Sequence, residues 1–203
     1  MDRDLFLEKV TKLFLVRGPK TLTMDDIAKE FSMSKKTLYQ LYPNKEELLT
    51  EVMVKTLECV MQGIKQKNET CKNPVAFFID SEQNFENLMV EIRDSFILQM
   101  VKYYPEILKA HTLKVYEELN GVFSQKIAQG RKLGVFREDF DEHMYAKFFI
   151  QLCSSADESP LFQEEIKNRI EFRTKVADFY LNAILTEKGK QNFKELKKND
   201  KKN

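Results

Sequence analysis

The feature that most constrains this chain is the recurrence of apolar residues at helical spacing, with few residues that break helices. One example is the series Met24, Ile27, Ala28 and Phe31, whose spacing is that of one helix face. The 203 residues include only 6 glycines and 5 prolines, which is little material for the many turns of a β-protein. The sequence therefore predicts an all-α fold of about nine helices.

Two short helices joined by a tight turn are predicted near the N-terminus, over residues 23–31 and 34–42. Thr23, with Asp26 three positions later, has the pattern of a capping box, which starts a helix. Pro43 biases the residue before it away from helical geometry and so ends the second helix. A helix, a turn of three or four residues and a second short helix form a helix-turn-helix unit.

A longer helix is expected to follow, because Asn44 and Glu47 have the spacing of another helix cap. We therefore expect a small head, residues 1–46, joined to a helical body, residues 47–203. The Lys-rich tail of the body, residues 187–203, is expected to be disordered. The other apolar stripes predict helices at residues 5–14, 48–64, 77–90, 92–104, 105–130, 144–152 and 166–183, with a polar loop at 65–74.

The second helix of the helix-turn-helix unit carries side chains suited to DNA. In such a unit this helix lies in the major groove, where its N-terminal residues contact base edges. Lys35 and Lys36 lie in its first turn, where a lysine is unfavourable by about 0.3–1 kcal/mol unless an anion such as phosphate is near. Lys36 can reach guanine, Gln40 is suited to adenine, and Tyr39 offers a hydroxyl to phosphate.

The remaining residues of this helix have roles that would complete the unit. Ser34 is expected to cap the helix, and Thr37 to address base edges. Leu38 and Leu41 are expected to face the core. A lysine pair alone is more often a solvated helix face, so the prediction depends on the pair together with the caps, the turn and the early proline.

The stretch RGPKTLTMDDIAKEFSMSKKTLYQLYPNKEELLTEVM, residues 17–53, resembles the DNA-binding head of TetR-type (tetracycline-repressor-like) transcriptional regulators. The matching pieces are LFLVRG, TMDDIA, SKKTLY and YPNKEEL, in the right order and at the right spacing. GVFREDFD, residues 134–141, resembles a connector found before the last two helices of many members. Beyond the head and this connector, the resemblance rests on length and helical pattern.

This resemblance implies an all-α homodimer whose head binds a palindromic operator. It implies that the last two helices of each protomer form a four-helix interface, and that a small hydrophobic ligand in the body releases the DNA. The chain would then be a cytoplasmic, ligand-responsive regulator, more often a repressor than an activator. The DNA-binding residues that the resemblance and the helix-turn-helix pattern imply are Thr23, Ser34, Lys35, Lys36, Thr37, Tyr39, Gln40 and Lys45.

The head departs from the family pattern at three positions. Many members have Gly where this chain has Ser32, so positive φ there would cost on the order of 1 kcal/mol. Many also have Gly in place of Lys36, which adds a cation facing DNA. Leu41 stands where Tyr or His is common, which implies the loss of one phosphate contact.

The body offers candidates for a ligand pocket and for a dimer interface. Met and aromatic side chains can line an adaptable apolar pocket, although at helical spacing they are more often plain core. The ligand candidates are Phe85, Met89, Phe96, Met100, Tyr103, Tyr104, Tyr116 and Phe123. The interface candidates, for which packing within the chain is an equal alternative, are Phe148, Leu152, Val176, Phe179, Tyr180 and Ala183.

Charge and composition narrow the other possibilities. Lys and Arg total 33 against 32 Asp and Glu, a formal charge of +1, so any nucleic-acid binding must come from a local patch. An odd cysteine count without CxxC spacing argues against disulfides, the acidic start argues against a signal peptide, and no apolar run approaches the roughly 20 residues that span a bilayer.

We predict no metal, no cofactor and no enzymatic activity. His111 and His143 have no ligand-like spacing, and no catalytic motif stands out. The alternative is a helical small-molecule-binding protein, or a small all-α enzyme, whose head does not bind DNA.

Overall fold

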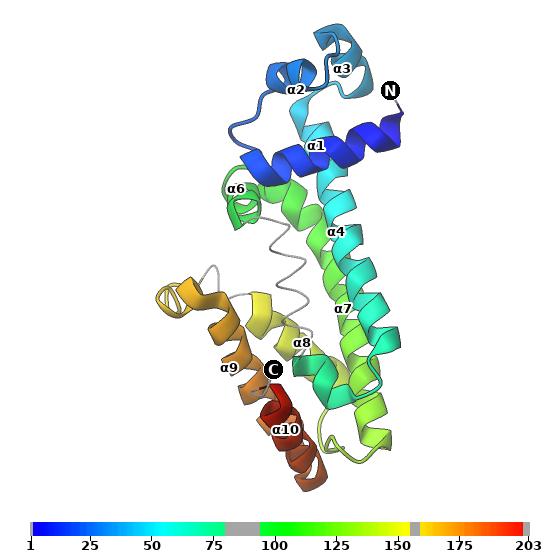
Figure 1. Ribbon diagram of the computed structural model, residues 1–203, viewed down its shortest axis with the longest axis vertical. Coiled ribbons are helices and arrows are strands. Elements are labelled where there is room, and N and C mark those ends of the chain that lie inside the picture. The colour runs from blue at the N-terminus through cyan, green and yellow to red at the C-terminus, as the bar shows by residue number, and fades with distance from the viewer. Residues whose placement is uncertain (1, 80–93, 155–158, 201–203) are drawn as a thin grey trace. The chain divides into compact units, whose positions relative to one another are not determined.

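The computed structural model describes residues 2–79, 94–154 and 159–200 and confirms the all-α prediction (Figure 1). Residues 74–79 are also helical, and the rest of the helix predicted at 77–90 lies outside the described residues. The helices are α1 (Arg3–Arg17), α2 (Met24–Glu30), α3 (Lys35–Leu41), α4 (Lys45–Thr70), α6 (Asp94–Tyr103), α7 (Pro105–Lys132), α8 (Glu142–Ser154), the 3-10 helix η2 (Glu165–Asn168), α9 (Arg169–Ile184) and α10 (Glu187–Asp200).

Packing divides the chain into two compact units. Unit 1 comprises Met1–Val60 and Asn87–Val115, and unit 2 comprises Met61–Glu86 and Tyr116–Asn203. Unit 1 therefore contains the helix-turn-helix segment together with α6. The boundary predicted after residue 46 separates a DNA-binding head from a ligand-binding body rather than two packed units. It stays a prediction.

The core of the head is built between α1 and the pair α2 and α3, which lies above it in Figure 1. Phe6 of α1 is buried, and its ring centre lies 5.0 Å from that of Phe31 and 6.0 Å from that of Tyr42. The Tyr42 hydroxyl donates to Glu51 Oε2 of α4 at 2.8 Å. These contacts join the end of α3 to both α1 and α4, and so fix the orientation of α3 in the head.

The predicted helix starts of the head are confirmed. Thr23 accepts from the Asp26 N–H at 3.1 Å, and Asp26 Oδ2 accepts from the Thr23 N–H at 3.0 Å, which completes the capping box of α2. The Glu47 N–H donates to Asn44 Oδ1 at 2.8 Å at the start of α4. As expected, α3 ends before Pro43.

The turn after α2 adopts the left-handed geometry for which many family members use glycine. Ser32 has φ +50°, its N–H donates to the Lys29 carbonyl at 3.1 Å, and the Met33 N–H donates to the Ala28 carbonyl at 2.9 Å. This pair of bonds is the Schellman ending of a helix. A residue with a Cβ is strained in this conformation.

Replacing Ser32 with glycine is therefore expected to stabilise the protein by about 0.5–1 kcal/mol, because glycine relieves the strain but loses more entropy on folding. Urea unfolding of the full chain measures this gain. Ser32→Ala is the control and should show no gain, because alanine keeps the Cβ. An equal gain from both variants would contradict the strain.

The core of unit 2 is a cluster of aromatic rings contributed by α7, α8, α9 and residues 74–79. Phe78 lies at its centre, with its ring centre 5.5 Å from those of Phe123 and Tyr180 and 5.1 Å from that of Phe149. Phe123 and Phe149 are themselves 5.0 Å apart. All four side chains are buried, so they hold the helices of unit 2 together.

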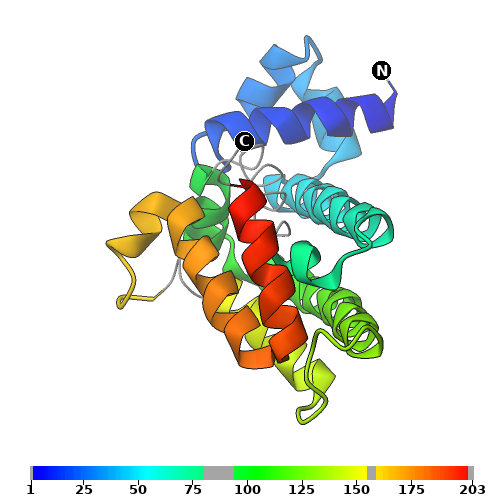
Figure 2. The same cartoon turned by 60° about the horizontal axis from the view of Figure 1, so that its bottom comes forward.

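The prediction of a disordered tail is wrong for residues 187–200, which form α10. This helix packs beside α9 (Figure 2). Phe193 is buried, Lys197 pairs with Asp178 of α9, and Asn192 accepts from Asn73 Nδ2 at 3.1 Å. One buried aromatic ring and these polar contacts order a segment whose lysine-rich composition suggested disorder.

The polar loop predicted at residues 65–74 is also largely wrong, because α4 continues to Thr70. The buried ammonium of Lys126, on α7, donates to the carbonyls of Asn68 and Cys71 at 2.9 and 2.8 Å. A cation is favourable at a helix C-terminus, where carbonyls lack helical partners. This contact with α7 is not visible in the local sequence.

Within the described ranges, no helix is both long and apolar enough to cross a membrane.

Candidate nucleic-acid interface

The helix α3 is presented at its N-terminus by a well-formed cap. Ser34 Oγ accepts from the Thr37 N–H at 3.0 Å, which confirms the predicted cap, and it lies 2.8 Å from Thr37 Oγ1. Among the capped helix starts of unit 1, this is the one whose first turn carries two lysines and no acidic residue. The N-terminus of α3 therefore combines two lysines with the positive end of the helix dipole.

Three of the predicted contact residues share one exposed face of α3. Lys36, Tyr39 and Gln40 are all exposed, and positions three and four apart lie on the same side of a helix. Among the described residues Lys36 has no ion-pair partner. This face therefore offers a cation, a phenol and an amide to one ligand surface.

Leu38 is fully buried as predicted, but the core position predicted for Leu41 is wrong, since Leu41 is 42% exposed. Tyr42, the extended residue directly after α3, is the next buried side chain after Leu38, so Leu41 is left outside the core. The exposed surface of α3 thus includes one apolar side chain.

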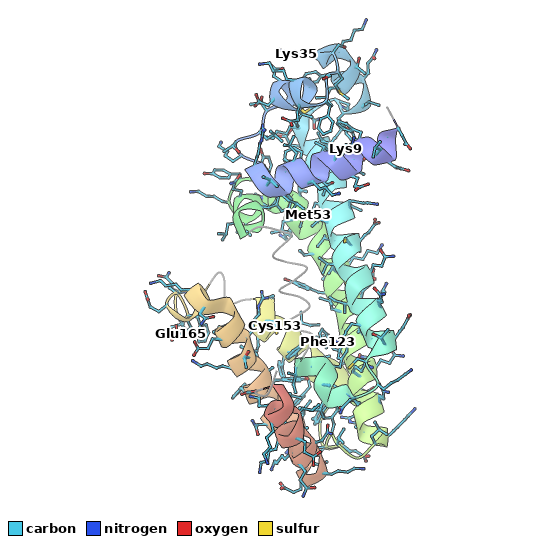
Figure 3. All side chains as sticks on the ribbon, in the orientation of Figure 1. Lys9, Lys35, Met53, Phe123, Cys153 and Glu165 are labelled. Atoms are coloured by element: carbon cyan, nitrogen blue, oxygen red, sulfur yellow. The ribbon has the colours of Figure 1, made fainter. Side chains whose placement is uncertain are left out.

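Lys35 has an internal partner that the sequence did not reveal. Its ammonium lies 2.5 Å from Asp25 Oδ2 of α2, and this hydrogen bond raises the pKa of Lys35. Figure 3 labels Lys35 in the head. Both side chains are exposed, and exposed ion pairs contribute little to stability. Lys35 therefore stays charged beside α2, and a phosphate would have to compete with Asp25 for it.

Two further candidates lie at helix starts beside this surface. Thr23 is exposed, and its hydroxyl lies 2.5 Å from Asp26 Oδ2 within the capping box. Lys45, the first residue of α4, is half-buried, and burial is the main cause that lowers its pKa. Thr23 is thus tied to its cap, whereas Lys45 is a partly desolvated cation.

The predicted ligand residues fall in both units. In unit 1, Phe96 and Met100 are buried, Tyr104 is half-buried and Tyr103 is exposed. In unit 2, Phe123 belongs to the aromatic core and Tyr116 is exposed. Phe85 and Met89 lie outside the described residues. Their roles as ligand contacts stay predictions.

A cavity of about 410 Å³ lies in unit 2 at the end of α4. Its lining includes Asn68, Cys71, Gln125, Lys126 and Gln129, and none of the predicted ligand residues. Lys126, which is buried there, donates to Gln129 Oε1 at 3.0 Å and to two carbonyls. The cavity wall is thus polar, unlike the aromatic pocket that the sequence suggested.

The predicted interface residues separate into two groups. Phe148, Leu152, Phe179 and Ala183 are exposed on α8 and α9, and Phe179 is 70% exposed. Val176 and Tyr180 are instead buried within unit 2, where the Tyr180 hydroxyl donates to the Tyr145 carbonyl at 2.9 Å. Val176 and Tyr180 thus follow the alternative considered for each candidate, which is packing within the chain.

Met144, which was not among the named interface candidates, is 50% exposed on α8. It occupies the position four residues before Phe148, so it extends the same exposed apolar face. The four-residue spacing was the available signal. The described residues contain no cluster of His, Cys, Asp and Glu suited to a metal ion.

These features define a class: an all-α protein with a capped helix-turn-helix that presents an electropositive helix. Residues 6–52 match the model of the bacterial regulatory proteins of the tetR family. The HTH-type transcriptional regulator YhgD of Bacillus subtilis (strain 168) is 27% identical over 181 residues, which is 83% of this chain and 92% of YhgD. Residues 6–52 thus match the DNA-binding segment of TetR-type transcriptional regulators, and the similarity to one HTH-type regulator extends over most of the chain.

Solved structures agree with the fold. A transcriptional regulator from Cytophaga hutchinsonii ATCC 33406 matches with a TM-score of 0.76 at 20% identity, covering 90% of this chain and 98% of that one. SmeT of Stenotrophomonas maltophilia, in its complex with triclosan, matches with a TM-score of 0.62 at 16% identity, covering 91% and 92%. The all-α architecture is thus shared along nearly the whole chain.

Proposed function

We propose that this protein is a homodimeric repressor that binds a palindromic operator and is released by a small hydrophobic effector. The observation that carries the DNA-binding part is the exposed face of Lys36, Tyr39 and Gln40 on the capped helix α3. It stands within the segment that matches the family model. As a regulator, the protein would act in the cytoplasm and catalyse no reaction.

In this proposal α3 enters the major groove. Lys36 and Gln40 contact base edges, for which lysine–guanine and glutamine–adenine pairs are suited. Thr37 and Leu41, on the neighbouring exposed side of α3, contact the groove wall or a thymine methyl. Tyr39 and Lys45 contact phosphate, together with Ser34, Thr23 and Lys35 when the DNA displaces their internal partners.

The dimer would form through the exposed apolar face of α8 and α9. Phe148 and Phe179 are the largest side chains on this face, and a self-complementary surface of this kind suits a two-fold interface. Two copies of α3 would then reach half-sites separated by one or more turns of DNA, about 34–36 Å each.

The effector part of the proposal rests on the relatives and on the aromatic residues. SmeT was solved with triclosan, a small molecule, and Phe96 and Met100 beneath α1 give unit 1 an apolar interior. Effector binding would bias two states of the head, with a coupling of typically about 1–3 kcal/mol. A ligand that bound without changing DNA affinity would contradict this part.

The dependence of DNA binding on salt tests the proposed function. With roughly 3–5 phosphate contacts per protomer, a plot of log K against log salt for purified protein and duplex DNA should have a slope of about −5 to −9. A flat response, or no binding at low salt, would favour a helical small-molecule-binding protein whose head does not bind DNA.

A further inference from the structure

The loop between α1 and α2 is held by α6, within unit 1. Gln99 of α6 accepts from the Lys20 N–H at 2.7 Å. Gly18, with φ +79°, lies directly against the same amide, since a Cβ on Gly18 would stand 2.4 Å from Gln99 Nε2. The main chain on both sides of Pro19 is therefore positioned by one side chain of α6.

Two lysine side chains lie against the consecutive tyrosines at the C-terminal end of α6, Tyr103 in the helix and Tyr104 directly after it. The Lys20 ammonium lies 4.7 Å from the centre of the Tyr103 ring, and the Lys45 ammonium lies 5.9 Å from the centre of the Tyr104 ring. Both distances are within the range of cation–π attraction. The Lys102 ammonium also lies near the Tyr103 ring, 5.3 Å from its centre.

Burial is the main cause that lowers the pKa of Lys45; the charge of Lys20 adds to this effect, whereas the charges of Glu46 and Asp26 oppose it. Neither lysine forms an ion pair with a carboxylate among the described residues. Each ammonium is held against a tyrosine ring instead, so it can bind an anion without first breaking an ion pair.

The location of the pair indicates which anion. Lys20 precedes the cap of α2 by three residues, and Lys45 follows the end of α3 by four. The pair thus flanks the helix-turn-helix unit at both of its ends. A helix in the major groove brings such flanking groups to the phosphate backbone.

We propose that Lys20 and Lys45 form a DNA phosphate-binding pair whose position is set by α6 through Gln99, Tyr103 and Tyr104. This inference rests on the proposed function and adds Lys20 to its DNA contacts. Lys20 and Lys45 are binding residues in this account, and Gln99, Tyr103 and Tyr104 are positioning residues.

The test compares the salt dependence of the full chain and of Lys20→Gln with a short fluorescent duplex of mixed sequence. Loss of one phosphate contact per protomer should make the slope shallower by about 2 for a dimer, so the advantage of the parent should shrink about 10-fold between about 50 and 200 mM salt. Lys114→Gln, which removes one exposed lysine from α7, should keep the parent slope.

The positioning role is tested by Tyr103→Leu, alone and combined with Lys20→Gln. Tyr103→Leu should weaken binding in the parent but add nothing when Lys20 is already gone, whereas a purely structural role would weaken both equally. A parent slope for Lys20→Gln would overturn the phosphate pair alone. A parent protein that does not bind DNA would overturn the proposed function and the pair together.

Discussion

Replacing Lys36 and Gln40 together with alanine is expected to reduce specific operator binding about 1,000-fold or more. Both side chains lie on the exposed face of α3, and each matched base contact provides about 1–3 kcal/mol of discrimination. A dimer would lose four such contacts. Binding should therefore fall to the non-specific level, which is typically about 10³–10⁷ weaker than specific binding. Fluorescence anisotropy with operator DNA measures the loss.

Lys109→Ala, which removes an exposed lysine from α7, is the matched control and should bind like the parent. Folding and dimerisation of the double variant should also be unchanged, as circular dichroism and sedimentation would show, because neither replaced side chain is buried. Parent-like operator binding by the double variant would mean that α3 does not read the sequence.

The second large effect is expected from Phe123→Ala, which should destabilise the protein by about 3–5 kcal/mol. The Phe123 ring is buried between Phe77, Phe78 and Phe149, with ring centres 5.0–5.7 Å away. Its removal leaves a cavity that these rings cannot fill without moving. Urea unfolding of the full chain measures the loss.

Tyr116→Ala provides the comparison, because Tyr116 is an aromatic residue of the same helix with 40% of its surface exposed. Its loss should cost much less than that of Phe123. A small effect of Phe123→Ala on stability, combined with weaker effector binding, would assign Phe123 to a ligand pocket rather than to the core.

The head was the part of the fold most open to prediction from sequence. Thr23 with Asp26 and Asn44 with Glu47 are local patterns, and the bonds that they form span three residues. Pro43 acts on its immediate neighbour. Since each signal and its consequence lie within one helical turn, the chain around α3 could be predicted without knowledge of its tertiary contacts.

Contacts between distant segments were beyond such reasoning. The ion pair of Lys35 with Asp25 joins two helices, and Lys126 binds the end of α4 from a helix more than fifty residues later in the chain. The order of α10 depends on the burial of Phe193. Periodicity identifies an apolar face but not what covers it, which is why Tyr180 and Phe179 looked alike in the sequence.

Selection of bound sequences from random duplex DNA with the purified protein tests most directly whether α3 reads an operator. We predict enrichment of a palindrome whose half-sites are separated by one or more helical turns. The Lys36 and Gln40 double variant should enrich no such sequence. Recovery of the unselected pool by the parent protein would contradict the assignment of α3 as the helix that reads DNA.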